Sequence, residues 1–193
     1  MTGTDARSRG APIAVVRAFL VHRSKVVCFG IVLAVALPIA SVALQITPST
    51  SSLPMAEDFR MWDSQTLAPF RVSDHRGKVV LLDFMATTCD VCRASMADLL
   101  TIHGTFEGDV FVLLSVTLFA GDTLATMEAY RREYSANWTF AMPVDAGEVA
   151  RDYEIAGFPT FVLLDRDGRI AYRAAGLMPV ETLLSHIENT IGR

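Results

Sequence analysis

Cysteine is scarce in this chain, which has three cysteines among its 193 residues. A closed structural zinc site needs four protein ligands, commonly two C-x-x-C pairs or one such pair with two histidines. Only one C-x-x-C pair is present, formed by Cys89 and Cys92, and the third cysteine, Cys28, stands far from it. The three histidines that follow residue 50 show no metal-ligand spacing to one another. This scarcity argues against a zinc finger, and we expect no metal at the pair.

Charged side chains are missing from residues 26–46, VVCFGIVLAVALPIASVALQI. A helix of that length spans about 31 Å, enough for the hydrocarbon core of a bilayer at about 30 Å. Five basic residues and one acidic residue precede the segment, and no charged residue follows it before Glu57. The positive-inside rule therefore predicts a cytoplasmic tail at 1–25, a transmembrane anchor at 26–46 and an extracytoplasmic remainder. The alternatives are a cleaved signal peptide, for which the small residues 41–43 offer a site, and a buried core helix.

Basic residues are also few, compared with acidic residues, after the apolar segment. From residue 55 onward the chain carries 12 of the 17 basic residues and 20 of the 21 acidic residues, a net charge of −8. An acidic domain is poorly suited to a polyanion, so we expect no nucleic acid partner. Residues 47–58, which include TPSTSSLP, are typical of an extended linker, and residues 59–193 have the length of a single domain.

Strand-like and helix-like runs alternate within residues 59–193. The first two strand-like runs are mostly apolar, and the first, which is rich in Val and Leu, shows no clean alternation, which is typical of a strand buried on both faces. The alternation of strands and helices favours a parallel central pair. The turn Asp165-Arg166-Asp167-Gly168 predicts a hairpin, which adds antiparallel strands to the same sheet. The sequence thus predicts a three-layer α/β domain with a mixed β-sheet. The expected order is strand 78–85, helix 91–106, strand 110–118, a helix capped by Asp122 and ending near 134, strand 139–144, helix 148–153, two strands within 161–176 and helix 180–191, after an unassigned lead-in at 59–72.

Cys89 and Cys92 follow a buried strand directly and stand at the start of a helix. A disulfide that closes only two intervening residues restricts the unfolded chain very little, so it would stabilise the fold poorly. The N–H groups and the positive dipole end of a helix N-terminus favour a thiolate at the first cysteine. The second cysteine would lie within the first turn and be better shielded. The position therefore predicts a redox-active disulfide between Cys89 and Cys92, which needs no other cofactor.

Three blocks of the sequence resemble one family. They are VVLLDFMATTCDVCR, PVDAGEVARDYEIAGFPTFVLLDRDGRI, and the single apolar segment with its linker. Together they resemble thioredoxin, and in detail the membrane-anchored TlpA/ResA group of thiol-disulfide oxidoreductases. The resemblance implies a thioredoxin-like three-layer sandwich preceded by one transmembrane helix. One position departs from the pattern: Thr88 stands before the first cysteine where the family usually has tryptophan, so the surface beside the sulfur is smaller and more polar.

The resemblance also implies roles for residues outside the pair. Asp83, within the apolar run VVLLDFM, matches the buried acid of thioredoxin; burial would raise its pKa and let it take a proton from Cys92. The alternative is a carboxylate at a strand end that faces solvent. Pro159 matches the cis-proline beside the disulfide, which would leave the Phe158 backbone free to pair with an extended substrate. The alternative is a trans-proline that opens a strand.

The residues next to the sulfurs are expected to tune them. Thr88, with Phe158 and Pro159, is predicted to contact the substrate. Asp90 and Val91 lie between the cysteines, and a negative charge beside Cys89 would disfavour its thiolate and make the pair more reducing. The alternative is that Asp90 is an exposed residue at the helix start with little effect on the sulfur.

The sequence thus predicts an extracytoplasmic thiol-disulfide oxidoreductase, a disulfide reductase rather than an oxidase, anchored by a single pass in the cell membrane. The resemblance implies disulfide-containing protein substrates, with apocytochrome c during cytochrome c maturation as one of them, and a membrane thiol carrier as the electron source. Three alternatives stay open. They are a copper-binding chaperone of the same fold, which would need a histidine near the thiols, a peroxiredoxin, and a redox-inert interaction domain.

Overall fold

A mixed β-sheet between helices forms the described part of the chain. The computed structural model describes residues 53–106 and 108–192. The expected tail at 1–25 and anchor at 26–46 lie outside these ranges. None of the helices within the described ranges combines the length and the apolarity that a membrane crossing requires.

The sheet has seven strands in the order β2-β1-β5-β4-β3-β6-β7. Strands β3, β4 and β5 are parallel neighbours, whereas β6 runs antiparallel to both β3 and β7, so the predicted mixed sheet is confirmed. The strands are β1 (Arg60–Asp63), β2 (Pro69–Arg71), β3 (Val79–Met85), β4 (Phe111–Thr117), β5 (Thr139–Pro143), β6 (Thr160–Leu164) and β7 (Ile170–Ala175). The helices are the 3-10 helix η1 (Val72–His75), α2 (Asp90–Thr105), α3 (Leu124–Glu133), α4 (Ala146–Asp152) and α5 (Val180–Ile191).

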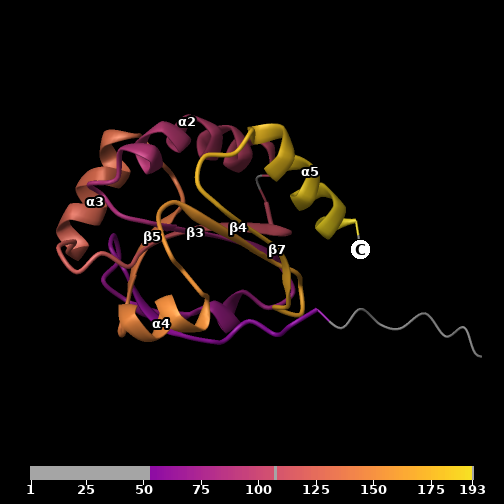
Figure 1. Cartoon of the computed structure of the whole chain (residues 1–193), viewed down its shortest axis with the longest axis horizontal. Helices are drawn as coiled ribbons and strands as arrows, with labels where there is room; N and C mark the ends of the chain where they lie inside the picture. The colour runs from indigo at the N-terminus through magenta and orange to yellow at the C-terminus, as the bar shows by residue number, and fades with distance from the viewer. Residues whose placement is uncertain (1–52, 107, 193) are drawn as a thin grey trace, which may run out of the picture. The chain divides into compact units, whose positions relative to one another are not determined.

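Strand β3 lies in the middle of the domain and is buried on both faces. Its odd-numbered apolar residues pack against α2, α3 and α5, and its even-numbered residues pack on the side of α4. Helices α2, α3 and α5 therefore cover one face of the sheet and α4 covers the other, which confirms the three-layer arrangement (Figure 1). Double-sided burial explains why the run VVLLDFM lacks the alternation of a half-exposed strand.

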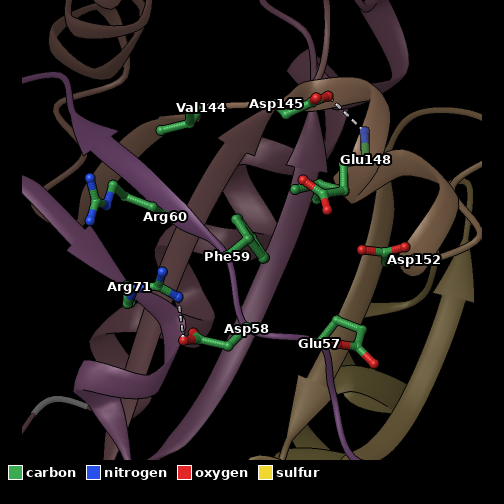
Figure 2. A pocket seen from close by; sticks show the side chains of 10 residues that line it. Glu57, Asp58, Phe59, Arg60, Arg71, Val144, Asp145, Glu148 and Asp152 are labelled. Carbon is green, nitrogen blue, oxygen red and sulfur yellow. Dashed lines mark hydrogen bonds and ion pairs between the residues drawn. The ribbon is translucent and has the colours of Figure 1, made fainter.

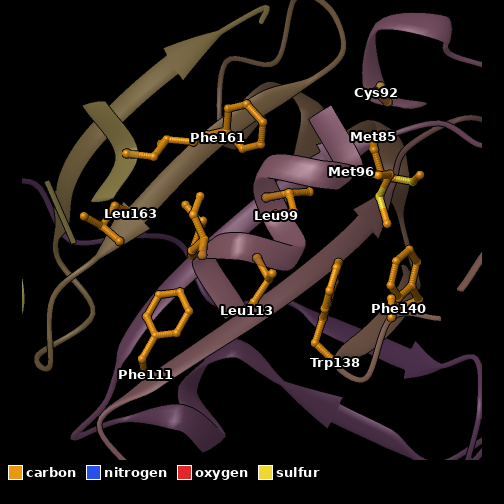
Figure 3. Close-up of a cluster of buried hydrophobic side chains, with 14 of the residues drawn as sticks. Met85, Cys92, Met96, Leu99, Phe111, Leu113, Trp138, Phe140, Phe161 and Leu163 are labelled. Carbon is orange, nitrogen blue, oxygen red and sulfur yellow. The ribbon is translucent and has the colours of Figure 1, made fainter. Parts of the chain in front are cut away.

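The core on the α2 side surrounds the second cysteine. Cys92, Met85 and Met96 lie together where β3 ends and α2 begins (Figure 3), and each is at most 2% exposed. Fully burying one such apolar side chain stabilises the fold by about 2 kcal/mol. The packing that stabilises the domain thus also shields Cys92 from water.

The end of the expected linker is part of the folded domain. The Ile170 N–H donates to the Pro54 carbonyl at 2.8 Å, and the Ala56 N–H donates to the Gly168 carbonyl at 3.0 Å. Ala56 is buried in the core on the α4 side. Residues 54–56 therefore pack against the β6–β7 hairpin, although residues 47–58 were predicted to form a linker.

The predicted cap of α3 was wrong by one residue. Thr123 is the N-cap: its hydroxyl accepts the Thr126 N–H at 3.1 Å, and the Thr126 hydroxyl accepts the Thr123 N–H at 2.8 Å. These two bonds form a capping box that satisfies the N–H groups of Thr123 and Thr126. Asp122 is left free to turn inward and is 5% exposed.

Candidate active site

The cysteine pair lies at the sheet edge where β3 ends and α2 begins. Cys89 is the N-cap of α2, and its Sγ accepts the Cys92 N–H at 3.0 Å. The two cysteines are joined by a disulfide, with their Cα atoms 5.2 Å apart. The sulfur of Cys89 therefore lies where the N–H groups and the dipole of the helix N-terminus favour a thiolate.

The two sulfurs differ in access. Cys92 is 2% exposed, whereas Cys89 is half-buried. A thiol that attacks another protein must be reached from outside, while a thiol that resolves the resulting bond only needs to reach its neighbour. The difference in exposure suits Cys89 to the first task and Cys92 to the second.

Asp83 is buried at 2% exposure on the α2 side of β3, so the prediction of a buried acid is confirmed over the solvent-facing alternative. The Ser115 hydroxyl donates to Asp83 Oδ2 at 2.9 Å, and the Trp138 Nε1–H donates to the Ser115 oxygen at 3.0 Å. Asp83 Oδ1 has no protein partner among the described residues. Burial raises the pKa of Asp83 to about 7, and the Ser115 bond only partly opposes that rise. The carboxyl group can therefore gain or lose a proton near neutral pH.

Ser115 and Trp138 were not singled out from the sequence, although a sequence pattern could have indicated Ser115. Ser115 interrupts the apolar run VFVLLSVTL as Asp83 interrupts VVLLDFM, and the parallel register places the two residues side by side. Polar residues at matching depths in two neighbouring buried strands predict a hydrogen bond between them. Trp138, the residue before β5, contacts this pair, which no local pattern indicates.

The Phe158–Pro159 peptide is cis, as the resemblance implied. Strand β6 begins at Thr160, which pairs with Phe84 near the end of β3. Pro159 thus lies at the same edge of the sheet as the loop that carries Cys89. In the described ranges, no hydrogen bond uses the backbone N–H or C=O of Phe158. These two groups are available to an extended peptide.

The remaining predicted residues surround the pair at the surface. Thr88 precedes Cys89 and is exposed, and Val91 is 43% exposed. Asp90 is the first residue of α2 and is exposed, a position where an acidic side chain also stabilises the helix. Solvent screens an exposed charge, so any effect of Asp90 on the Cys89 sulfur would be small.

Arg93 and Asp122 were not predicted to belong to the site, yet both hold the loop before Cys89. The Arg93 Nη2 group donates to the Thr87 carbonyl at 2.9 Å, and its guanidinium carbon lies 5.4 Å from the ring centre of Tyr130. Asp122 accepts the Thr87 N–H at 3.1 Å. The contacts Asp122–Thr87 and Arg93–Tyr130 join segments more than 30 residues apart in sequence, which is why composition and periodicity could not reveal them.

The histidines of the described residues pack on aromatic rings. The ring of His103 lies 5.4 Å from that of Trp138, and His186 stacks on Tyr172 at 3.6 Å. His75 lies 5.8 Å from the ring of Phe70. Within residues 53–106 and 108–192, no group of three or more His, Cys, Asp or Glu side chains is placed to hold a metal ion.

A cavity of about 380 Å³ on the α4 side of the sheet is separate from the cysteine pair (Figure 2). Its lining carries five carboxylates and two arginines: Glu57, Asp58, Asp145, Glu148, Asp152, Arg60 and Arg71. Two of these carboxylates have structural partners. Asp58 accepts from Arg71 at 2.7 Å, and Asp145 caps α4 by accepting the Glu148 N–H at 2.8 Å.

Comparison with known protein families agrees with the fold. The family model described as "AhpC/TSA family" matches residues 54–173, which include both cysteines, Asp83, Asp122 and Pro159. The match therefore covers most of the described domain.

Similar curated proteins bear the name "Thiol-disulfide oxidoreductase ResA". The protein from Geobacillus kaustophilus is 27% identical over 120 residues, which are 62% of this chain and 67% of that protein. The protein from Oceanobacillus iheyensis is 28% identical over 120 residues, which are 62% of this chain and 60% of that protein. The alignments span about two thirds of the length of these relatives. A solved structure titled "putative Thiol:disulfide interchange protein DsbE" from Chlorobium tepidum has a TM-score of 0.65 and 27% identity, and covers 75% of this chain and 100% of that one.

Proposed function

The chain belongs to the AhpC/TSA family and has a thioredoxin-like fold, and we propose that it is a thiol-disulfide oxidoreductase that reduces protein disulfides outside the cytoplasm. The observation that carries this proposal is the placement of the cysteine pair. A half-buried sulfur caps α2, a shielded sulfur lies one turn inward, and a buried carboxyl group lies on the same side of β3. A two-step disulfide exchange requires these three groups: an accessible attacking thiol, a second thiol close to it, and a group that accepts a proton.

The first step is attack by the Cys89 thiolate on one sulfur of a substrate disulfide. The substrate S–S bond breaks, and a bond forms between Cys89 Sγ and the attacked sulfur. The other substrate sulfur leaves as a thiolate and takes a proton. Because Cys89 is the more accessible sulfur and lies at a helix N-terminus, it is suited to this attack.

The second step frees the substrate. Cys92 gives its proton to Asp83, and the Cys92 thiolate attacks Cys89 Sγ. The bond between Cys89 and the substrate breaks, the second substrate sulfur leaves and is protonated, and the Cys89–Cys92 disulfide forms. Two electrons thus pass from the cysteine pair to the substrate, and the pair ends in the disulfide form, which is also the form in the structure.

The partners in this proposal are disulfide-containing proteins, with apocytochrome c as one substrate, and a membrane thiol carrier that reduces the pair again. An extended substrate segment would pair with the free backbone groups of Phe158 and contact Pro159 and Thr88.

Disulfide exchange fits the pair better than peroxidase chemistry does, because a peroxidatic cysteine does not need a second cysteine three residues away. Titration of the reduced chain with copper separates the proposal from a copper chaperone, which would bind the metal tightly at both thiols.

The reduction potential of the pair tests the direction of electron flow. For a reductase we expect a value near that of thioredoxin, about −270 mV, rather than near that of the oxidant DsbA, about −120 mV. The pair should therefore stay oxidised in a glutathione buffer that reduces DsbA completely.

The location outside the cytoplasm gives a second prediction. If residues 26–46 anchor the chain with its basic tail inside, protease added to spheroplasts should digest the domain from residue 54 onward. A tag fused before residue 1 should survive the same treatment, and a cytoplasmic marker protein should stay intact as a control. A domain that resists protease until the membrane is dissolved would refute the proposed topology.

A further inference from the structure

We propose that Asp122 is a positioning residue for the attacking cysteine, because it holds the loop of residues 86–89 through Thr87. This inference rests on the proposed function and adds to it a residue outside both the C-x-x-C and the buried acid of β3. Asp122 lies in the loop between β4 and α3, and its side chain reaches a residue that is 35 positions earlier in the chain.

The carboxylate of Asp122 is buried at 5% exposure and is held by neutral donors. It accepts the Thr87 N–H at 3.1 Å and the Thr117 hydroxyl at 2.5 Å, and it also accepts the Thr87 hydroxyl. A buried carboxylate is unfavourable unless several donors replace its hydration, and three donors converge here. The helix that follows has its own cap at Thr123, so Asp122 is not needed to start α3.

Thr87 is held on both sides of its backbone. Its N–H donates to Asp122, and its carbonyl accepts from Arg93 Nη2 at 2.9 Å. Two residues further on, the Cys89 N–H donates to the Ala86 carbonyl at 3.1 Å and closes the turn. The loop cannot move away from the sheet without breaking one of these contacts.

Asp122 is itself fixed to the ends of two neighbouring strands. Thr117 is the last residue of β4 and pairs with Met85, the last residue of β3. The Leu118 N–H donates to the Met85 carbonyl at 3.3 Å and continues the pairing into the loop. The position of Thr87, and through it that of Cys89, is therefore set relative to β3, the strand that carries Asp83.

A fixed loop matters because the attacking sulfur must approach the substrate disulfide in line. A misplacement of about 1 Å can slow such a reaction by about a hundredfold. Without Asp122 the Thr87 N–H loses its partner, and Cys89 can turn away from the start of α2. The attack by Cys89 should slow. The later attack by Cys92 on Cys89 Sγ should slow less, because the two residues are neighbours at the start of α2.

The test compares two substitutions in the full chain. Asp122→Ala removes all three acceptor contacts. Asp122→Asn keeps the shape, and its oxygen can still accept the Thr87 N–H while its amide donates to a threonine hydroxyl. Stopped-flow mixing of the reduced protein with a disulfide-containing peptide separates attack from resolution. We expect Asp122→Ala to slow attack about tenfold and resolution less than about twofold, and Asp122→Asn to slow attack less than about threefold.

The double variant with Thr87→Val shows whether Asp122 acts through Thr87. If it does, the two substitutions together should slow attack hardly more than Asp122→Ala alone, because both remove the same link. Should Asp122→Ala fail to fold, Thr87→Val alone decides the matter with an expected slowing of attack by about two- to fivefold.

Asp145→Ala is the matched control. Asp145 also accepts a backbone N–H, but it caps α4 on the other side of the sheet. Its loss should lower the unfolding temperature and leave the rate of attack unchanged. The proposal is overturned if folded Asp122→Ala attacks within about twofold of the parent, or if Asp145→Ala is slowed as much.

Amide hydrogen exchange tests the role of Asp122 in holding the loop without depending on the proposed reaction. Exchange at Thr87 and Cys89 should be at least about tenfold faster in Asp122→Ala than in the parent. If the parent does not react with the peptide at all, the proposed function fails, while faster exchange still supports the role of Asp122 in holding the loop. Unchanged exchange at both residues refutes that role.

Discussion

Cys92→Ser should accumulate covalent complexes with partner proteins on non-reducing gels, and Cys89→Ser should not. The half-buried Cys89 makes the bond to the substrate, and the buried Cys92 breaks it. Removal of the second thiol leaves the mixed disulfide without its intramolecular attacker, whose effective concentration is very high. We expect the lifetime of the mixed disulfide to rise by at least about a hundredfold, so mass spectrometry of the complexes would identify the substrates.

A variant with serine at both positions is the control for this experiment, because it retains Cys28 and reports any complex that this third thiol makes. Trapping by Cys89→Ser in place of Cys92→Ser would reverse the two roles. If neither variant traps a partner and both retain full activity, the pair is not the reacting group and the proposed function is wrong.

Asp83→Asn should stabilise the folded protein at alkaline pH. The folded pKa of Asp83 is about 7, against an ordinary value of 3.8. Between these values the folded state holds a proton that the unfolded state has lost, so the free energy of unfolding falls as the pH rises from about 4 to about 7. The difference between the two pKa values corresponds to ~4 kcal/mol, which the ionised carboxylate costs above about pH 7. Asparagine removes that cost.

Denaturant unfolding of the oxidised protein measures this effect. At about pH 8 the variant should gain up to ~4 kcal/mol over the parent, and at about pH 4 the gain should shrink below ~1 kcal/mol. Asp145→Asn, at an exposed position on the other side of the sheet, serves as the control. A gain that stays constant from acid to alkaline pH would show that Asp83 ionises normally in the folded protein.

The same substitution should separate the two chemical steps. Asparagine cannot take the proton of Cys92, so resolution of the mixed disulfide should slow by at least about tenfold at neutral pH, with little change in the initial attack. In the parent, the rate of resolution should rise with pH through about 7 as Asp83 ionises. Equal rates for variant and parent in both steps would remove Asp83 from the mechanism.

The features that could be predicted are those that local sequence specifies. A run as apolar as VVLLDFM favours a strand covered on both sides, and the structure shows that the acid inside it is buried with it. Asp165–Gly168 forms the expected turn, in which Gly168 adopts a φ of +75° that other residues rarely adopt. The cis peptide before Pro159 was implied by the resemblance alone.

The features that were missed depend on contacts between distant segments. Strands β1 and β2 have four and three residues, too few for a periodic pattern, and exist because β5 offers β1 a free edge. Asp122 stands at a position that suits a helix cap by local rules. Its burial follows from two threonines on other elements, which only the folded sheet brings together.

Equilibration of the full chain with buffers of defined glutathione or dithiothreitol potential tests the central claim most directly. The fraction of the Cys89–Cys92 pair in the disulfide form is measured by alkylating the free thiols and determining the mass of the protein by mass spectrometry. We expect a two-electron transition near that of thioredoxin, about −270 mV, which is lost when either cysteine is replaced by serine. A transition near that of DsbA, about −120 mV, would contradict a reductase, and a pair that does not exchange with either reagent would contradict thiol-disulfide chemistry altogether.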